Sequence, residues 1–271
     1  MDDGNDRVSP RFAALARLHG ADAPALLAEM HVCVVGVGGV GSWALEALAR
    51  TGIGALTFID GDRICETNVN RQLHALTDTI GRPKVEVMAE RVLGIHPECR
   101  IHPVQDYLTV RNLDALIGRG FDYVIDAIDS ISFKAALVHY CRRRKLPVVM
   151  TGGAGGLTDP TRIGVADLTR TWNDPLAAKV RAMLRSRYGY SRNPKRRFGI
   201  ECVFSTEQPR YPRPDGTVGH EKPGIHGVSL DCRFGYGSTA PVTATFGMIA
   251  ASRAINRGLE RARCRRRSGG G

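Results

Sequence analysis

The sequence predicts a doubly wound α/β protein with a mainly parallel sheet, helices on both faces and a C-terminal extension. Two observations support this prediction. Residues 32–62 read as a strand, a glycine-rich turn, a helix, a second strand and an acid, and short apolar runs then alternate with helical patterns. With 271 residues the chain can bury a sizeable core, so one large domain is expected.

The first strand and turn have the pattern of a nucleotide-binding unit. Residues 32–35 form a β-branched run typical of a buried strand, and apolar residues at helical spacing follow over 42–50. Between them, Gly36, Gly38 and Gly41 form the pattern G-x-G-x-x-G. Glycines let the backbone approach phosphate oxygens, and the next helix directs unpaired N–H groups at the anion. The alternative is a glycine turn that serves only close packing.

A second apolar run, residues 56–59, ends at Asp60, where an acid can bond a ribose hydroxyl in Rossmann-like units. A dense polar cluster follows Asp62 and comprises Thr67, Asn68, Asn70, Arg71, Gln72 and His74. Arg71 is suited to bidentate contacts with phosphate. Lys84 falls in the first turn of a helix predicted to run to about residue 94. A lysine there opposes the helix dipole, which favours a phosphate-facing role over that of an idle surface lysine.

Further strands are predicted at residues 100–104, 123–126 and 147–150, with a helix over 131–145. Asp126 and Asp129 follow the second of these strands, where a magnesium–nucleotide complex would need oxygen ligands. A cap or turn role is the alternative for Asp126, so Asp129 is the better metal candidate. A second glycine-rich turn, residues 151–156, either approaches a ligand or only turns the chain.

At each end of the chain a predicted helix of the main domain adjoins a terminal segment outside it. Residues 1–10 are expected to be disordered and lack the apolar core of a signal peptide. Residues 11–29 are expected to form one helix, with an apolar stripe of Phe12, Leu15, Leu18, Leu26 and Leu27. Residues 241–255 read as a core helix, shorter than the roughly 20 residues that cross a bilayer. Residues 259–271 are expected to be a basic, flexible tail.

The formal net charge of +11 suggests a polyanionic partner, with nucleic acid as the first candidate and a merely soluble basic surface as the alternative. Residues 175–240 are expected to be a basic, Gly- and Pro-rich insertion that contacts this partner. Tyr188, Tyr190 and Phe198 are interleaved with its cations and could stack on unpaired bases. The alternative is a mobile, solvated loop.

The seven cysteines are scattered and form no C-x-x-C pair, so a structural zinc site is not expected. An odd cysteine count without a secretory signal fits a reducing cytosol, which predicts a cytoplasmic protein. Cys202 and Cys232 lie in the Gly-, Pro- and Ser-rich stretch 201–240. Nothing near either residue predicts a low thiol pKa, so a buried or inert thiol is expected at each position.

An ordered series of motifs, GVGGVG, IDGD, TNVNRQ, GRPK and DAIDS, spans residues 32–130 and resembles the ubiquitin-activating-enzyme superfamily, which includes the ThiF-like and MoeB-like adenylyltransferases. Further stretches, among them ARLHG, TGGAGG, DPLAAK, CVFSTE and VTATFG, are similar to the family of tRNA threonylcarbamoyladenosine dehydratases. That family uses ATP to cyclise N6-threonylcarbamoyladenosine beside the anticodon of tRNA. The resemblance implies an ATP-binding adenylating domain over residues 11–258, a homodimer, and a sulfur-relay (cysteine desulfurase) protein as a candidate partner.

The resemblance also implies roles for single residues. Asp60 would bind the ribose with Asp62 nearby, and Gly39 with its neighbouring glycines would hold the nucleotide. Phosphates would be contacted by Asn68, Arg71 and Lys84, magnesium would be bound by Asp129, and Ser130 would line the pocket. A carboxylate of the substrate would attack the α-phosphate of ATP, and Arg71, Lys84 and the magnesium at Asp129 would neutralise the developing charge. A carbamoyl nitrogen held close would then displace AMP.

The chain departs from the superfamily in two places. Ser130 stands where an asparagine is usual, and Ala14 where an early arginine is usual, which leaves Arg11 or Arg17 as candidate substitutes. The absence of paired C-x-x-C zinc ligands argues against a plain activator of a ubiquitin-like sulfur carrier, which adenylates a C-terminal glycine and is the main competing hypothesis. A nicotinamide-dependent oxidoreductase and a non-catalytic RNA-binding module are two further hypotheses.

Overall fold

One twisted sheet forms the centre of the computed structural model, which describes residues 9–221 and 237–268. Its strand order is β3-β2-β1-β4-β5-β7-β6, and every neighbouring pair is parallel except β7 and β6. The strands are β1 (His31–Val35), β2 (Ala55–Ile59), β3 (Arg100–Val104), β4 (Tyr123–Asp126), β5 (Val148–Thr151), β6 (Ile163–Asp167) and β7 (Glu201–Ser205). A separate two-stranded ribbon pairs β8 (Tyr211–Pro212) with β9 (Val218–Gly219).

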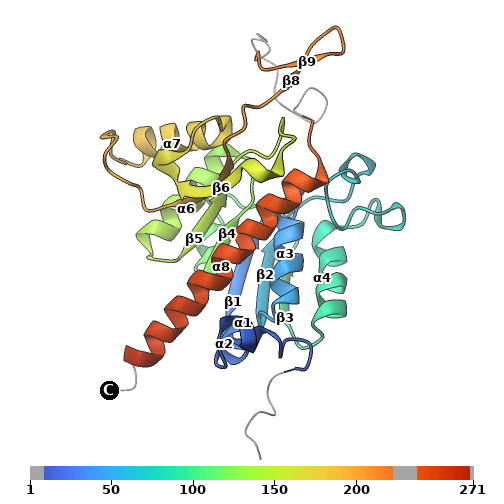
Figure 1. The fold of residues 1–271 in the computed structure, drawn as a ribbon, viewed down its shortest axis with the longest axis vertical. Helices are drawn as coiled ribbons and strands as arrows, with labels where there is room; N and C mark the ends of the chain where they lie inside the picture. Colours follow the sequence, from blue (N-terminus) through green and yellow to red (C-terminus); the bar gives the residue numbers. More distant parts are fainter. Residues whose placement is uncertain (1–8, 222–236, 269–271) are drawn as a thin grey trace, which may run out of the picture.

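Helices cover both faces of the sheet (Figure 1). They are α1 (Leu15–His19), α2 (Ala23–Glu29), α3 (Gly41–Arg50), α4 (Lys84–Ile95), α5 (Leu113–Ile117), α6 (Ile131–Arg143), α7 (Pro175–Arg187) and α8 (Ala240–Ser268). Along β1, Val32 and Val34 pack in one apolar cluster with α3, α4 and α8, whereas Cys33 and Val35 pack in a second cluster with α5, α6 and α7. This alternation, which follows the period of two of a strand, confirms the predicted doubly wound sheet with two covered faces.

The long helix α8 crosses the sheet beside α3 (Figure 1). Small residues let it approach closely, since a Cβ at Gly247 would lie 2.4 Å from the carbonyl oxygen of Val40. The predicted flexible tail was wrong for residues 259–268, because α8 continues to Ser268. Leu259 and Ala262 extend its buried stripe, and Arg263 and Arg266 pair with acids of the α2 region. Residues 269–271 lie outside the described residues.

The N-terminal region also differs from the prediction. The single helix expected over residues 11–29 is two helices, α1 and α2, separated at Gly20, whose φ of 100° an α-helix cannot accommodate. Leu18, placed in the predicted apolar stripe, is 75% exposed, whereas Leu26 and Leu27 are buried. Residues 1–8, most of the predicted disordered end, lie outside the described residues.

The segment 175–240 is not an insertion, because β7 lies inside the sheet between β5 and β6. Residues 202–205 are buried, so the short run of Cys202, Val203 and Phe204 belongs to the core rather than to a surface loop. Residues 222–236, including Cys232, lie outside the described residues. In the described part of the chain, no helix is both long and apolar enough to span a membrane.

Candidate nucleotide site

The predicted nucleotide-binding residues gather at the carboxyl ends of β1, β2 and β4. The strand order reverses between β1 and β4, and doubly wound sheets bind ligands at such a point. Gly36 follows β1 with a φ of 89°, and a Cβ there would lie 2.8 Å from the carbonyl oxygen of Ala127, just after β4. The glycine turn is therefore pressed against the turn that carries Asp129.

The four glycines of the turn serve two purposes. A Cβ at Gly41 would lie 1.8 Å from the carbonyl oxygen of Gly36, so Gly36 and Gly41 are required for close packing. A Cβ at Gly38 would have no atom nearer than one of Gln72 at 3.9 Å, and a Cβ at Gly39 would lie 3.3 Å from the side chain of Arg71. The packing alternative thus holds for Gly36 and Gly41, Gly39 allows Arg71 and Thr243 to lie close to the turn, and only Gly38 has open space where a side chain would be.

Asp60 lies directly after β2 and holds the glycine turn. Its Oδ2 accepts a hydrogen bond from the amide of Val37 at 2.6 Å, and its Oδ1 accepts one from the amide of Asp62 at 2.9 Å. Burial raises the pKa of Asp60, although Lys84 and the two amide donors act in the opposite direction. The carboxylate is thus fixed beside the turn, at the position expected of a ribose ligand.

Lys84 is the first residue of α4 and is 5% exposed. Its Nζ donates to Asp62 Oδ2 at 2.6 Å and lies 3.8 Å from Asp60 Oδ1. The hydroxyl of Tyr107 donates to the other oxygen of Asp62 at 2.6 Å. Burial of Asp62 opposes its ionisation, but the hydrogen bonds from Lys84 and Tyr107 prevail and lower the pKa of its carboxyl. The sequence prediction included Lys84 and Asp62 but missed Tyr107, which is distant in sequence and has no motif around it.

Asn68 is the last residue of η1 (Glu66–Asn68), and Arg71 lies on the loop that follows and borders the glycine turn. Nη1 of Arg71 donates to the carbonyl of Thr67 at 2.7 Å and to Asn70 Oδ1 at 2.9 Å, and no carboxylate pairs with Arg71 among the described residues. Asn68 is buried, and its Oδ1 accepts from the amide of Cys65 at 3.0 Å. Asn68 therefore shapes the loop, while the guanidinium of Arg71 has no counter-charge of its own.

The turn after β4 contains two carboxylates with different surroundings. Asp126 is completely buried and pairs with Lys134 at 2.8 Å, so this side chain is structural and not a metal ligand. Burial raises the pKa of Asp126, and the ion pair with Lys134 opposes that change. Asp129 is exposed, and its carboxylate has no hydrogen-bond or ion-pair partner in the part of the chain that the structure describes. Ser130 precedes α6, and its hydroxyl lies 3.4 Å from that of Ser132.

A magnesium ion suits Asp129 only together with a nucleotide. Within residues 9–221 and 237–268, no group of three or more His, Cys, Asp or Glu residues could hold a metal ion. Magnesium is commonly held by one or two carboxylates plus substrate phosphates and water, so a single free carboxylate at this edge fits that donor set.

Two buried polar residues near the site were not assigned a role from sequence. His74 is 1% exposed, and neither ring nitrogen has a hydrogen-bond partner among the described residues. Burial lowers the pKa of His74 to about 4, and the nearby Lys84 adds to this effect. Asp174 accepts a hydrogen bond from the amide of Gly153 at 3.1 Å and caps α7 through the amide of Ala177 at 2.9 Å. The motif Asn-Asp-Pro before α7 is a cap signal that could have identified Asp174.

Asp174 also clarifies the second glycine-rich turn. A Cβ at Gly152 would lie 1.7 Å from Asp174 Oδ2, so Gly152 is needed for packing.

Two other predictions concern residues that lie away from the nucleotide site. Cys202 is completely buried, and burial raises the pKa of its thiol, as expected of an inert cysteine. Arg11 donates to the carbonyl of Ile95 at 3.0 Å, at the end of α4 opposite Lys84, so in this chain it does not join the site.

The site and fold are those of a nucleotide-binding α/β protein, and the chain belongs to the ThiF family, whose model matches residues 11–264. The tRNA threonylcarbamoyladenosine dehydratase of Escherichia coli (strain K12) is 53% identical over 259 residues, which cover 95% of this chain and 97% of that protein. The structure of E. coli TcdA in complex with ATP is 51% identical with a TM-score of 0.82, and covers 93% of this chain and 95% of that chain. The complex with AMP is 52% identical with a TM-score of 0.83 and the same coverage.

Proposed function

We infer that this protein catalyses the ATP-dependent dehydration, that is the cyclisation, of N6-threonylcarbamoyladenosine in tRNA, with release of AMP and pyrophosphate. The observation that carries this conclusion is the similarity along nearly the whole chain to a tRNA threonylcarbamoyladenosine dehydratase. Similar structures have been solved with ATP and with AMP. The alternative, activation of a ubiquitin-like sulfur carrier, is not favoured, because relatives that match nearly the whole chain are named as dehydratases.

The chemistry requires that a poor electrophile be activated. The threonyl carboxylate attacks the α-phosphorus of ATP, the bond to the β-phosphate oxygen breaks, and pyrophosphate leaves. A carbamoyl nitrogen then attacks the acyl-adenylate, loses its proton to solvent and expels AMP, which carries away the oxygen lost from the substrate. Proximity contributes most to this second step, since both groups belong to one nucleoside.

We assign the charge stabilisation in the first step to Arg71 and Lys84. Lys84 is held by two carboxylates and Arg71 by a carbonyl and an amide oxygen, so both cations are oriented before the nucleotide arrives. Donors fixed in advance stabilise developing charge without reorganisation at the moment of reaction. Asp129 would hold magnesium, which when bound supplies Lewis-acid stabilisation of the phosphates. Gly38, Gly39 and Asp60 would hold the phosphates and ribose.

We assign tRNA contact to the exposed loop between α7 and β7. The loop's cations are all exposed and have no ion-pair partner within the described part of the chain: Arg192, Lys195, Arg196 and Arg197. The predicted base stacking is not supported, because Phe198 is 5% exposed and packs edge-on against Tyr190, while Tyr188 packs on His139. The contact is therefore made by charge, through phosphates.

The test is incubation of the purified protein with ATP, magnesium and tRNA that carries the modified nucleoside. We expect mass spectrometry of the nucleosides to find the loss of one water molecule, together with equal amounts of AMP and pyrophosphate. No loss of water, or pyrophosphate exchange that needs a small carrier protein and ignores tRNA, would refute the function. A homodimer, a cytoplasmic location and a sulfur-relay partner stay predictions, and sedimentation with and without a cysteine desulfurase tests the first and the last.

A further inference from the structure

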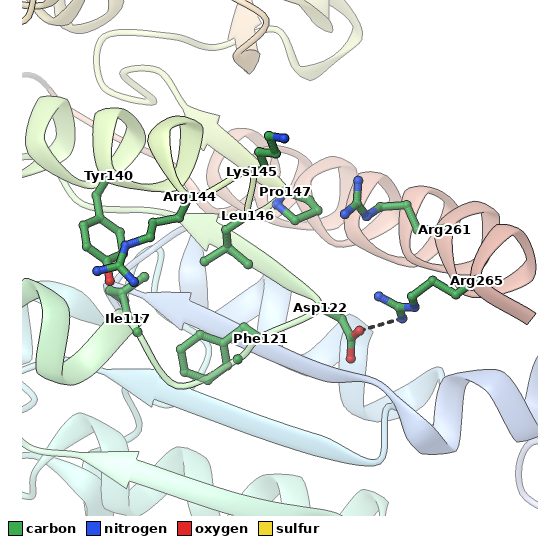
Figure 2. A pocket seen from close by; sticks show the side chains of 12 residues that line it. Ile117, Phe121, Asp122, Tyr140, Arg144, Lys145, Leu146, Pro147, Arg261 and Arg265 are labelled. Atoms are coloured by element: carbon green, nitrogen blue, oxygen red, sulfur yellow. Dashed lines mark hydrogen bonds and ion pairs between the residues drawn. The ribbon is translucent and has the colours of Figure 1, made fainter. Parts of the chain in front are cut away.

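A hollow of about 300 Å³ (Figure 2) is lined by residues that precede β4 and β5, at the end of the sheet opposite the nucleotide site. It is bounded by the segment before β4, the end of α6 and the last turns of α8. Asp122, at its edge, immediately precedes β4, whereas Asp126 ends that strand near the glycine turn. The hollow and the nucleotide site therefore lie at the two ends of one strand.

The rim of the hollow is strongly basic. Four cations, Arg144, Lys145, Arg261 and Arg265, line it together with one acid, Asp122. Arg265 pairs with Asp122 at 2.7 Å and Arg144 pairs with the exposed Asp114 at 2.6 Å. Lys145 and Arg261 have no ion-pair partner among the residues that the structure describes, and both are exposed. Figure 2 shows Arg261 and Arg265 extending from α8 into the space beside Pro147 and Asp122. Lys145 lies on the side of Leu146 and Pro147 that is away from Asp122.

The hollow offers little surface for stacking, since the guanidinium of Arg144 already covers the ring of Tyr140 at 5.0 Å from the ring centre. Phe121 and Ile117, which line the hollow, are only 5% and 1% exposed. A ligand would therefore meet the cations of the rim and little aromatic surface. This arrangement suits the phosphates of a nucleic-acid backbone better than an unpaired base, which needs an accessible aromatic face.

We propose that the basic hollow (Arg144, Lys145, Arg261 and Arg265) binds backbone phosphates in the paired region of the tRNA whose modified nucleotide reacts with the ATP held in the nucleotide site. The proposal rests on the proposed function. In a tRNA the loop that bears such a nucleotide is joined to a double-helical stem. The backbone phosphates of the tRNA therefore continue away from the reacting nucleotide along a rigid duplex. Proteins recognise such a duplex by its shape and its phosphates rather than by its sequence.

Helix α8 gives the distance between the two places. Thr243 near its start donates to the carbonyl of Arg71 at 3.3 Å, beside the glycine turn. Arg261 lies on the same helix, and the rise of 1.5 Å per residue places it about 27 Å further along. That span is too long for the ATP or the modified nucleotide to reach the hollow, but short enough for the tRNA stem that continues from the modified nucleotide.

One element, the end of α6, adjoins both the hollow and the basic loop assigned to tRNA. Arg142, near the end of α6, lies against Gly199, where a Cβ would be 3.0 Å from its guanidinium. The end of α6 thus adjoins both the basic loop and, through Arg144 and Lys145, the hollow. An acidic protein or a second copy of this chain would need a matching acidic surface, whereas RNA supplies a negative charge at every residue.

The test compares Lys145→Gln, Arg261→Gln and the double variant with Arg266→Gln, which removes the same charge from α8 but faces Glu29. The affinity for full-length tRNA is measured without ATP by fluorescence anisotropy over a range of salt concentrations. Each single variant should weaken binding several-fold and reduce the slope of log K against log salt by about 1, and the double variant by about 2. A hairpin whose stem is shortened to the base pairs next to the loop should not reach the hollow. It should therefore bind wild type and variants with the same affinity.

Three results would overturn the proposal: unchanged salt slopes, an equal loss in Arg266→Gln, or a change in sedimenting mass without a change in tRNA affinity. The last result would make the hollow a contact between copies of the chain. All substituted side chains are exposed, and thermal melting verifies that the variants remain folded. Failure of the proposed function is separate, because it would be seen as wild-type protein that leaves the modified nucleoside unchanged in the presence of ATP.

Discussion

Replacement of Lys84 by methionine should slow AMP formation at least about 100-fold and leave the fold intact. The ammonium of Lys84 lies 2.6 Å from Asp62 Oδ2 and 3.8 Å from Asp60 Oδ1, and the side chain is almost completely buried. Methionine keeps an unbranched stem that fills the same space, so the substitution removes charge with little change in packing. The two acids would then face the nucleotide phosphates without a cation between them.

The size of the effect follows from the role assigned to Lys84. Loss of one preorganised donor to developing charge typically lowers kcat about 100- to 1,000-fold, or roughly 2.7–4 kcal/mol. We expect at least the lower value, because Lys84 carries a full charge. The unfolding free energy should fall by only about 1–2 kcal/mol, since Asp62 is half exposed and Asp60 keeps two amide donors.

The assay is AMP release from ATP with modified tRNA, combined with calorimetric titration of ATP and urea denaturation. Lys179→Met is the matched control for ATP affinity, because Lys179 is an exposed lysine of α7, on the other face of the sheet. A Lys84→Met protein that stays folded and turns over within threefold of wild type would refute the assigned role. If that variant does not fold, Lys84→Gln, which retains a hydrogen-bond donor to Asp62, takes its place in the same assay.

Three further predictions concern stability and reactivity. Lys134→Met should lower the unfolding free energy by about 3–5 kcal/mol, because it leaves the buried Asp126 unpaired, and urea denaturation should show a smaller loss when Asp126→Leu is added. Tyr107→Phe should destabilise the protein by less than about 1 kcal/mol, because both partners are exposed. Because folding lowers the pKa of Asp62, its carboxylate stabilises the fold at pH values above the unfolded pKa, and this stabilisation is lost as the pH falls through the folded pKa. Denaturation curves of wild type and Tyr107→Phe should therefore converge in acid and differ most near neutral pH. Alkylation of native protein, followed by peptide mass spectrometry, should label the exposed Cys65 and Cys264, and hydrogen bonds from Thr67 lower the thiol pKa of Cys65. The buried thiols should not be labelled: Cys33, Cys99, Cys141 and Cys202. Rapid labelling of Cys202 would contradict its burial.

The nucleotide-binding unit could be predicted almost to the residue because its signals are local. The predicted strands at 32–35 and 56–59 are β1 and β2, each longer by one residue, and the predicted helix at 42–50 is α3 from Gly41. The alternation of strand, turn and helix over this region leaves little freedom of interpretation. The structure also confirms the strand at residues 100–104 and the one at 123–126.

The errors arose where the pattern depends on contacts between distant segments. β7 is five residues long and joins the sheet by pairing with β5, about 50 residues earlier. The segments next to β7 in sequence therefore did not show the alternation of strand and helix that identified the other strands. The end of α8 looks like a disordered basic tail until its partners are known. Arg263 and Arg265 are held by Asp22 and Asp122, which come from two other parts of the chain.

In the candidate site, too, the sequence predicts where residues lie but not which of them form ion pairs. Asp60 directly follows β2, Lys84 begins α4, and Asp129 lies in the short turn between β4 and α6. The carboxyl ends of parallel strands meet at one edge of the sheet, so motifs are enough to place the three residues together. Motifs do not state which charges are already paired. Lys84 is held by Asp60 and Asp62, whereas Asp129 faces solvent, and only the folded arrangement distinguishes a cation oriented in advance from a carboxylate left free. That difference supports the roles proposed above, phosphate stabilisation for Lys84 and metal binding for Asp129, because a metal ligand must remain available until the nucleotide arrives.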